Sequence, residues 1–188
     1  MIDKKTLSDI HARFRQLRSG ELADNLAAQG INYRIAWGVE SYKLREIASE
    51  FQQDKELAEA LWKEDVRESK MLATRLYPIN ELSQETALAW VKEAKYTEIV
   101  DQVCMNILSK MPNVEDIVVR LVEEGKLAET ENFTNSATSP IEIYTALKLA
   151  TRNEIQSPEI LSLAEKILSE NYPIYLKTAA LWYKQIYD

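Results

Sequence analysis

Residues 96–112, YTEIVDQVCMNILSKMP, set the carboxylate of Asp101 among regularly spaced apolar side chains. The apolar positions recur at intervals of three and four, which predicts an amphipathic helix with Asp101 inside it. A carboxylate that loses water without a partner is strongly disfavoured, so Asp101 needs either a partner or an opening to a groove. A groove that a ligand can enter is the functional alternative. The structural alternative is that Asp101 caps a neighbouring helix or pairs with Lys70 or Arg67.

Outward from this stretch, the chain repeats a pattern of two amphipathic helices with a short break. The predicted pairs are 57–63 with 67–78, 82–94 with 96–112, 114–125 with 139–153, and 157–171 with 172–187. Helix pairs that recur every 35 to 45 residues or so are typical of HEAT-type α-solenoids, in which neighbouring pairs bury each other's apolar faces. We therefore predict an all-α fold, an α-solenoid of HEAT-like antiparallel helix pairs, forming one superhelical domain over residues 1–188. The second helix of each pair should line a concave groove.

Three further helices should precede these pairs. The first covers 6–17 and is ended by Gly20, and the second covers 21–29 and is closed by Gly30. The third begins at Ser41, because serine is a good N-cap residue. Residues 126–139, KLAETENFTNSATS, are polar and without periodicity, so we predict a loop excursion there rather than a domain boundary.

Composition narrows the class of protein. The low content of glycine (4) and proline (5) in 188 residues favours long helices over a turn-rich sheet protein. A single cysteine, Cys104, and a single histidine, His11, argue against an internal disulfide and against a common zinc centre, so we expect neither metal nor cofactor. Uncharged apolar runs stay well short of the roughly 18 residues that span a bilayer. We expect a cytoplasmic monomer that does not enter a membrane.

The net charge of −7 is unusual for a nucleic-acid-binding protein, and it is unevenly distributed. Residues 1–100 hold 15 basic and 17 acidic side chains, whereas residues 101–188 hold 8 and 13. A basic groove should therefore lie on the N-terminal half. Arg67, Lys70 and Arg75 follow one another along a predicted second helix and are the candidate DNA-binding residues. The alternative is that they belong to ordinary solvated helix faces.

Between about residues 33 and 108, short motifs follow one another in a characteristic order. They are Gly38-Val39, Leu44-Arg45, Ile47-Ala48, Glu56-Leu57-Ala58, Leu61-Trp62, Arg67-Glu68 and Asp101-Gln102-Val103-Cys104. In their order and spacing these motifs resemble the DNA alkylation repair family, the AlkD-like HEAT-repeat DNA glycosylases. The HEAT-type fold that the resemblance implies agrees with the fold predicted from the repeat.

The resemblance implies binding of DNA in the concave groove and hydrolysis of the N-glycosidic bond of cationic alkylated purines. Asp101 matches the catalytic aspartate of the family, and Tyr33, Thr97 and Trp182 fall at substrate-pocket positions. Two positions depart from the family: Thr97 stands where a tryptophan is usual, and the groove arginine has no match before Arg152. The alternative is a catalytically degenerate solenoid that binds DNA or a protein partner without excision. In that case Trp182 packs the C-terminal end instead of lining a pocket.

Overall fold

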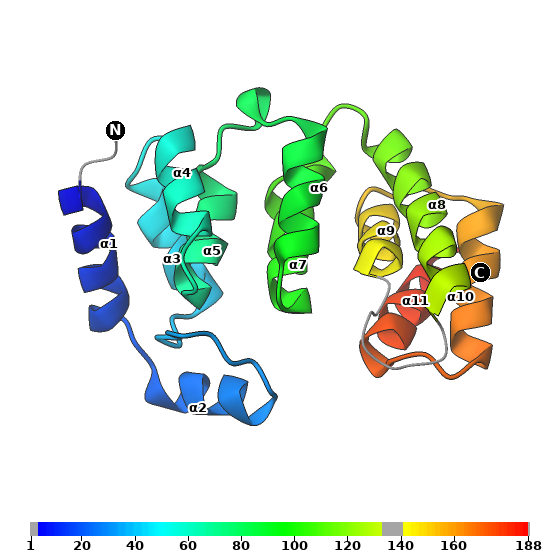
Figure 1. Ribbon diagram of the computed structural model, residues 1–188, viewed down its shortest axis with the longest axis horizontal. Helices are drawn as coiled ribbons and strands as arrows, with labels where there is room; N and C mark the ends of the chain where they lie inside the picture. The colour runs from blue at the N-terminus through cyan, green and yellow to red at the C-terminus, as the bar shows by residue number, and fades with distance from the viewer. Residues whose placement is uncertain (1–3, 133–140, 188) are drawn as a thin grey trace. The chain divides into compact units, whose positions relative to one another are not determined.

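The computed structural model describes residues 4–132 and 141–187, and every regular element of substantial length in these ranges is a helix. The chain forms two units, unit 1 (Met1–Leu82) and unit 2 (Ser83–Asp188). We describe each unit by itself (Figure 1). The expectation that residues 1–188 make one superhelical domain stays a prediction.

Unit 1 contains α1 to α5 and one short 3₁₀ helix. Their bounds are α1 Lys4–Gln16, α2 Gly20–Ala28, α3 Ser41–Ser49, α4 Lys55–Trp62, α5 Arg67–Leu76 and η1 Ile79–Glu81. Helices α3 and α4 both pack against α5. The ring of His11, on α1, accepts or donates a hydrogen bond of 2.9 Å with the Glu64 carboxylate, which also accepts from the buried Ser69 hydroxyl. This polar contact joins α1 to the α4–α5 pair.

Unit 2 contains three successive helix pairs. Their bounds are α6 Gln84–Glu93, α7 Thr97–Asn106, η2 Leu108–Lys110, α8 Val114–Asn132, α9 Ile141–Arg152, α10 Pro158–Ser169 and α11 Ile174–Tyr187. Within the pairs, α6 packs on α7, α8 on α9 and α10 on α11. The second helices also contact each other, since α9 packs on both α7 and α11 (Figure 1). This is the repeating arrangement that the sequence predicted, with the second helices forming one layer.

The α10 helix shows how the sequence sets these elements. The Ser157 hydroxyl accepts a hydrogen bond from the Ile160 amide, which supplies the N-cap, and Pro158 occupies the first turn, where its missing N–H costs nothing. The buried side chains then recur at spacings of three and four: Ile160, Leu163, Ala164 and Ile167. Burial of this stripe against α11 stabilises the pair.

The α8–α9 contact depends on a small residue. A Cβ atom on Gly125 would lie only 2.3 Å from Cγ1 of Ile143, so glycine at this position allows the two helices to approach closely. Helix α9 is correspondingly buried along most of its length, with Ile143, Ala146 and Leu147 all inaccessible to solvent. It is the central helix of unit 2, and three of its partly exposed positions, Lys148, Thr151 and Arg152, line the pocket described below.

Two predicted helix boundaries and one predicted N-cap were wrong. Gly20 opens α2 instead of ending the preceding helix, because the Ser19 hydroxyl caps α2 by accepting from the Leu22 amide. Ser41 is the first residue of α3 and Glu40 is its N-cap, without a side-chain hydrogen bond. Helix α8 continues to Asn132 rather than giving way to a loop at residue 126. Lysine, leucine, alanine and glutamate in 126–132 are good helix formers, and their propensity outweighs the loss of apolar periodicity. The rest of the predicted loop, 133–139, lies outside the described residues.

Candidate functional site

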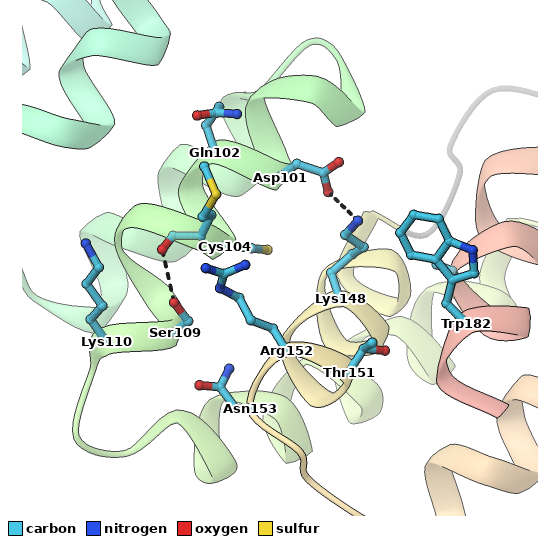
Figure 2. Close-up of a pocket in the computed structure, with 12 residues that line it drawn as sticks. Asp101, Gln102, Cys104, Ser109, Lys110, Lys148, Thr151, Arg152, Asn153 and Trp182 are labelled. Carbon is cyan, nitrogen blue, oxygen red and sulfur yellow. Dashed lines mark hydrogen bonds and ion pairs between the residues drawn. The ribbon is translucent and has the colours of Figure 1, made fainter. Parts of the chain in front are cut away.

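A cavity of about 760 Å³ lies in unit 2 among the second helices. Helices α7, α9 and α11 each contribute side chains to it, together with the η2 turn (Figure 2). The lining residues are Asp101, Gln102, Cys104, Met105, Ser109, Lys110, Lys148, Thr151, Arg152, Asn153, Ala179 and Trp182. The prediction that second helices line a common surface is therefore met within unit 2.

Helix α7 places Asp101 at this cavity by burying the opposite face. Ile99, Val100 and Val103 are fully inaccessible, which fixes the rotation of the helix, while the Asp101 side chain keeps 38% of its surface exposed. The carboxylate thus stays in contact with solvent and retains a low desolvation cost. It is open to a ligand that enters the cavity.

One oxygen of Asp101 is held by two groups from α9. The Tyr144 hydroxyl donates a hydrogen bond of 2.9 Å to Oδ1, and Lys148 Nζ lies 3.3 Å from the same oxygen. Among the described residues, no hydrogen bond reaches Oδ2. The Asp101 carboxylate is therefore oriented by contacts to Oδ1, and Oδ2 remains available to accept a hydrogen bond. The structural alternative drawn from the sequence was an ion pair with Lys70 or Arg67, and the structure shows the ion pair of Asp101 with Lys148.

Tyr144 is a buried partner of this carboxylate. Only 6% of its surface is exposed, and its ring packs edge-on against Tyr175 with centroids 5.4 Å apart. Burial, and then the negative charge of Asp101 with its hydrogen bond, raise the pKa of the Tyr144 phenol far above its ordinary value. Tyr144 is thus a fixed hydrogen-bond donor that stays protonated at neutral pH.

Lys148 lies between the carboxylate and two aromatic rings. Its ammonium is 5.2 Å from the centroid of the Trp182 ring and 5.9 Å from that of Tyr144. Both distances fall within the range of about 6 Å over which a cation is attracted to a ring face. Figure 2 shows the Lys148 side chain reaching from α9 toward Asp101, with the Trp182 indole from α11 on its other side.

Two more cations line the cavity. Arg152 and Lys110 are both exposed, and the part of the chain that the structure describes offers neither an ion-pair partner. They come from the more acidic half of the sequence, whereas the charge count predicted basic residues on the N-terminal half. Cys104, also in the lining, is buried, and burial followed by the charge of Asp101 raises the pKa of its thiol, so it remains a protonated, unreactive side chain.

The predicted pocket residues are only partly brought together. Trp182 lines the cavity with 52% of its surface exposed, so it does not pack the C-terminal end. Thr97 is the first residue of α7, one turn before Asp101, and is half-buried outside the lining. Tyr33 belongs to unit 1, in the segment between α2 and α3, where it is half-buried. The predicted pocket roles of Thr97 and Tyr33 stay predictions.

The predicted DNA-binding residues on α5 are engaged within unit 1. Arg67 is only 4% exposed, and its Nη1 donates to the Val39 carbonyl at 3.0 Å and to Glu68 Oε1 at 3.1 Å. Glu68, fully buried, also accepts from the amides of Trp37 and Val39. Arg67 therefore has no surface from which to reach a phosphate, and the Arg67-Glu68 motif holds unit 1 together.

Lys70 and Arg75, the other two basic residues on α5, are half-buried. Lys70 Nζ donates to the Trp62 carbonyl at 2.6 Å and lies 4.6 Å from the centroid of its ring. Arg75 donates to the Ser41 hydroxyl at 3.0 Å, and burial, aided by the charge of Arg45, lowers the pKa of its guanidinium. Both side chains contribute to packing in unit 1, and their contact with DNA stays a prediction.

Sequence reasoning missed the groups that α9 contributes. Tyr144, Lys148 and Arg152 are spaced by four, which puts them on one face of a helix, and that face is turned to Asp101. The signal was in the sequence as an aromatic and two cations at regular helical spacing. The sequence comparison with the family concerned a single groove arginine, so the regular spacing of these three residues was missed.

The described residues contain neither a cluster of three potential metal ligands nor a helix long and apolar enough to cross a membrane. The pocket lining includes one carboxylate, one tryptophan and three cations, and the Tyr144 hydroxyl contacts the carboxylate from the buried side. A carboxylate beside aromatic faces suits a cationic ligand, and exposed lysine and arginine suit phosphate.

Comparisons with known proteins agree with the predicted fold and family. No curated protein matches the chain. A solved structure matches 97% of this chain and 74% of its own, with a TM-score of 0.74 and 16% sequence identity; it is described as "a new family of proteins related to the HEAT-like repeat DNA glycosylases with affinity for branched DNA structures". At that identity the similarity shows the fold, and it confirms the predicted all-α, HEAT-like solenoid.

A family model described as "DNA alkylation repair enzyme" matches residues 10–131. The match covers more than half of the 188 residues and includes α7 with Asp101. The resemblance noted in the sequence is thus confirmed, and the chain belongs to the DNA alkylation repair enzyme family.

Proposed function

We propose that this protein binds DNA through the face of unit 2 formed by α7, α9 and α11, and that Asp101 hydrolyses the N-glycosidic bond of a cationic alkylated purine. The observation that carries the proposal is the state of Asp101. Its Oδ1 is fixed by Tyr144 and Lys148, while Oδ2 receives no hydrogen bond from the described residues, and the residue lines a cavity of about 760 Å³. Membership of the DNA alkylation repair family supports the choice of substrate.

The chemistry follows from where charge develops. As the bond from C1′ to the positively charged base stretches, its electron pair moves to the base nitrogen and the sugar gains oxocarbenium character. Asp101 Oδ2 stabilises that positive charge and orients a water, whose oxygen forms the new bond to C1′ and whose proton passes to the carboxylate or solvent. The base leaves neutral, so the reaction needs no metal or redox cofactor.

The cations at the rim account for DNA binding by a protein of net charge −7. Arg152 and Lys110 lie at the same cavity as Asp101, on α9 and η2, and are exposed. A local cluster of cations attracts the phosphate backbone even where the whole protein is acidic. The reason is that repulsion from acidic side chains more than about 10 Å away is largely screened at 0.1 M salt. The phosphates then position the base above the cavity.

Release of free base from methylated duplex DNA tests the excision step. The wild-type protein should release methylated purines, and Asp101→Asn should abolish release while leaving DNA affinity within about twofold, since Asp101 is not a phosphate ligand. Asp116→Asn is the matched control: it removes the same charge from an exposed position on α8, outside the cavity, and should keep full activity. Equal release by wild type and Asp101→Asn would refute the role of Asp101.

A second candidate is DNA binding without excision, and two observations favour it. The Lys148 ammonium neutralises Asp101, and Thr97 supplies no aromatic wall one turn before it. Under this alternative, anisotropy titrations should show binding that weakens steeply with salt, with no base release. Replacing Arg152 or Lys110 by alanine should lower the salt slope by about 1 each. Because a protein of similar fold is described as having affinity for branched DNA, the titrations should compare a branched junction with a duplex.

A further inference from the structure

Lys148 occupies the place in the cavity where a positively charged ligand would be best stabilised. Its ammonium is 3.3 Å from Asp101 Oδ1, 5.2 Å from the centroid of Trp182 and 5.9 Å from that of Tyr144. A carboxylate and aromatic faces around one point are the groups that bind quaternary ammonium and N-alkylated heterocyclic cations. We refer to Asp101, Tyr144 and Trp182 as the cation cage.

We propose that Lys148 is an internal cation that fills this cage in the ligand-free protein, and that only an organic cation can take its place. The identity of the natural ligand rests on the proposed function, whereas the occupancy of the cage by Lys148 does not. A neutral ligand that displaced Lys148 would leave Asp101 without a countercharge. A cationic ligand restores the charge balance and keeps the contacts with both rings.

The geometry allows Lys148 to leave. Its side chain is 24% exposed, and a lysine ammonium is a point charge on a flexible four-carbon stem. Lys148 lies one turn before Arg152, which lines the same cavity. When a cationic base enters the cage, the ammonium can swing toward a DNA phosphate beside Arg152. This exchange would couple binding of the DNA phosphate backbone to entry of the base into the cage. An unmodified, neutral base would not replace the positive charge of Lys148, so its entry would not be stabilised.

Choline and its neutral carbon isostere, dimethylbutanol, test the occupancy without DNA. Lys148→Met removes the ammonium and keeps the length of the side chain. This variant should bind choline at least about tenfold more tightly than the wild type, as followed by chemical-shift changes of the Trp182 indole N–H, while dimethylbutanol binding should stay unchanged. Lys148→Gln, also neutral, should behave in the same way, and Lys148→Arg should show no gain.

Lys92→Met is the matched control. It removes one positive charge and one ion pair, to Glu124 at 3.0 Å, from an exposed site outside the cavity, and should leave choline binding as in the wild type. Adding Trp182→Leu to Lys148→Met should cancel the gain. Equal choline binding by the wild type and both neutral variants would overturn the proposal, as would an equal gain for dimethylbutanol.

The outcome is separable from that of the proposed function. Tighter choline binding in Lys148→Met together with absent base release would support the cage and refute excision. Base release that depends on Asp101, without any gain of choline binding, would support excision and refute the role of Lys148. Circular dichroism on each variant confirms that the helices are intact before binding is compared.

Discussion

Unit 1 and unit 2 can be compared through a carboxylate–cation pair that lies on second helices in each, because the two pairs differ in burial. In unit 1, Arg67 and Glu68 are adjacent on α5, with side chains 5% and 0% exposed. In unit 2, Lys148 and Asp101 join α9 to α7, with side chains 24% and 38% exposed. The first pair is removed from solvent, and the second stands at the wall of a cavity.

The comparison shows that residue type and helical position do not decide what a charged pair does. Both carboxylate oxygens of Glu68 accept hydrogen bonds, from Arg67 and from the amides of Trp37 and Val39. Because the side chain is also buried, a ligand cannot reach it. Asp101 receives its contacts on one oxygen only. A buried pair has its hydrogen bonds completed by the protein, whereas a half-exposed pair can exchange them for those of a ligand.

The largest effect is expected from Glu68→Gln. It would leave the Arg67 guanidinium buried without its countercharge, which costs about 3–5 kcal/mol of unfolding free energy. Urea denaturation measures the loss. The corresponding change in unit 2, Asp101→Asn, should cost less than about 1 kcal/mol, because that pair is half-exposed. Similar losses in the two variants would contradict the difference in burial.

Gly38→Ala should come next. Gly38 has φ +68°, and a Cβ there would lie 2.1 Å from the Ser19 carbonyl oxygen, so the segment whose amides bind Glu68 must shift. Strain of this kind costs about 1–3 kcal/mol, which thermal unfolding measures. Gly20→Ala is the control, because a Cβ at Gly20 meets no atom within 4 Å, and it should leave the melting temperature unchanged or slightly raised. Equal changes in melting temperature for the two substitutions would contradict a specific requirement for glycine at position 38.

Tyr144→Phe should have a moderate effect, centred on the pocket. It removes the hydrogen bond to Asp101 Oδ1, which is worth about 1–2 kcal/mol when the acceptor is charged. In a base-release assay this variant should lower kcat and leave KM nearly unchanged. The Asp101 carboxylate loses its orientation, whereas the DNA contacts remain. Tyr175→Phe, which changes a neighbouring hydroxyl without a hydrogen bond to Asp101, is the control and should leave kcat unchanged. A rise in KM alone would place Tyr144 in DNA binding instead.

The smallest effect concerns the ionisation of Tyr144. Its pKa is raised by burial first and by Asp101 second, so the folded protein favours the neutral phenol. That contribution to stability is complete below the ordinary tyrosine pKa and is lost as the pH rises through the raised value. Asp101→Asn should lower the Tyr144 pKa without restoring the ordinary value, because burial persists. Tyrosinate absorbance, compared with that of Tyr144→Phe, measures the change; an unaltered pKa would mean that burial acts alone.

Much of the fold could be predicted because helical periodicity is a local property. The stripe at Ile160, Leu163 and Ile167 is readable from spacing alone, and the recurrence of such helices in pairs identified the HEAT-like solenoid. The errors came at boundaries, where Ser19 rather than Ser41 provides a side-chain cap. Both serines are good N-caps in isolation. Which of the two serines becomes an N-cap depends on the residue at which the helix begins, and this is set by the path of the preceding chain.

The candidate site was predictable in part. The helices, their pairing, the family and the choice of Asp101 as the carboxylate of interest follow from the amino-acid sequence. The burial of Arg67 with Glu68 became visible in the folded chain alone. The same holds for the contacts of Asp101 with Lys148 and Tyr144, which lie more than 40 positions further along. The physical reason is that periodicity fixes which face of a helix is apolar. The partner that a charged side chain meets depends on which helix packs opposite, and on how much water that packing excludes.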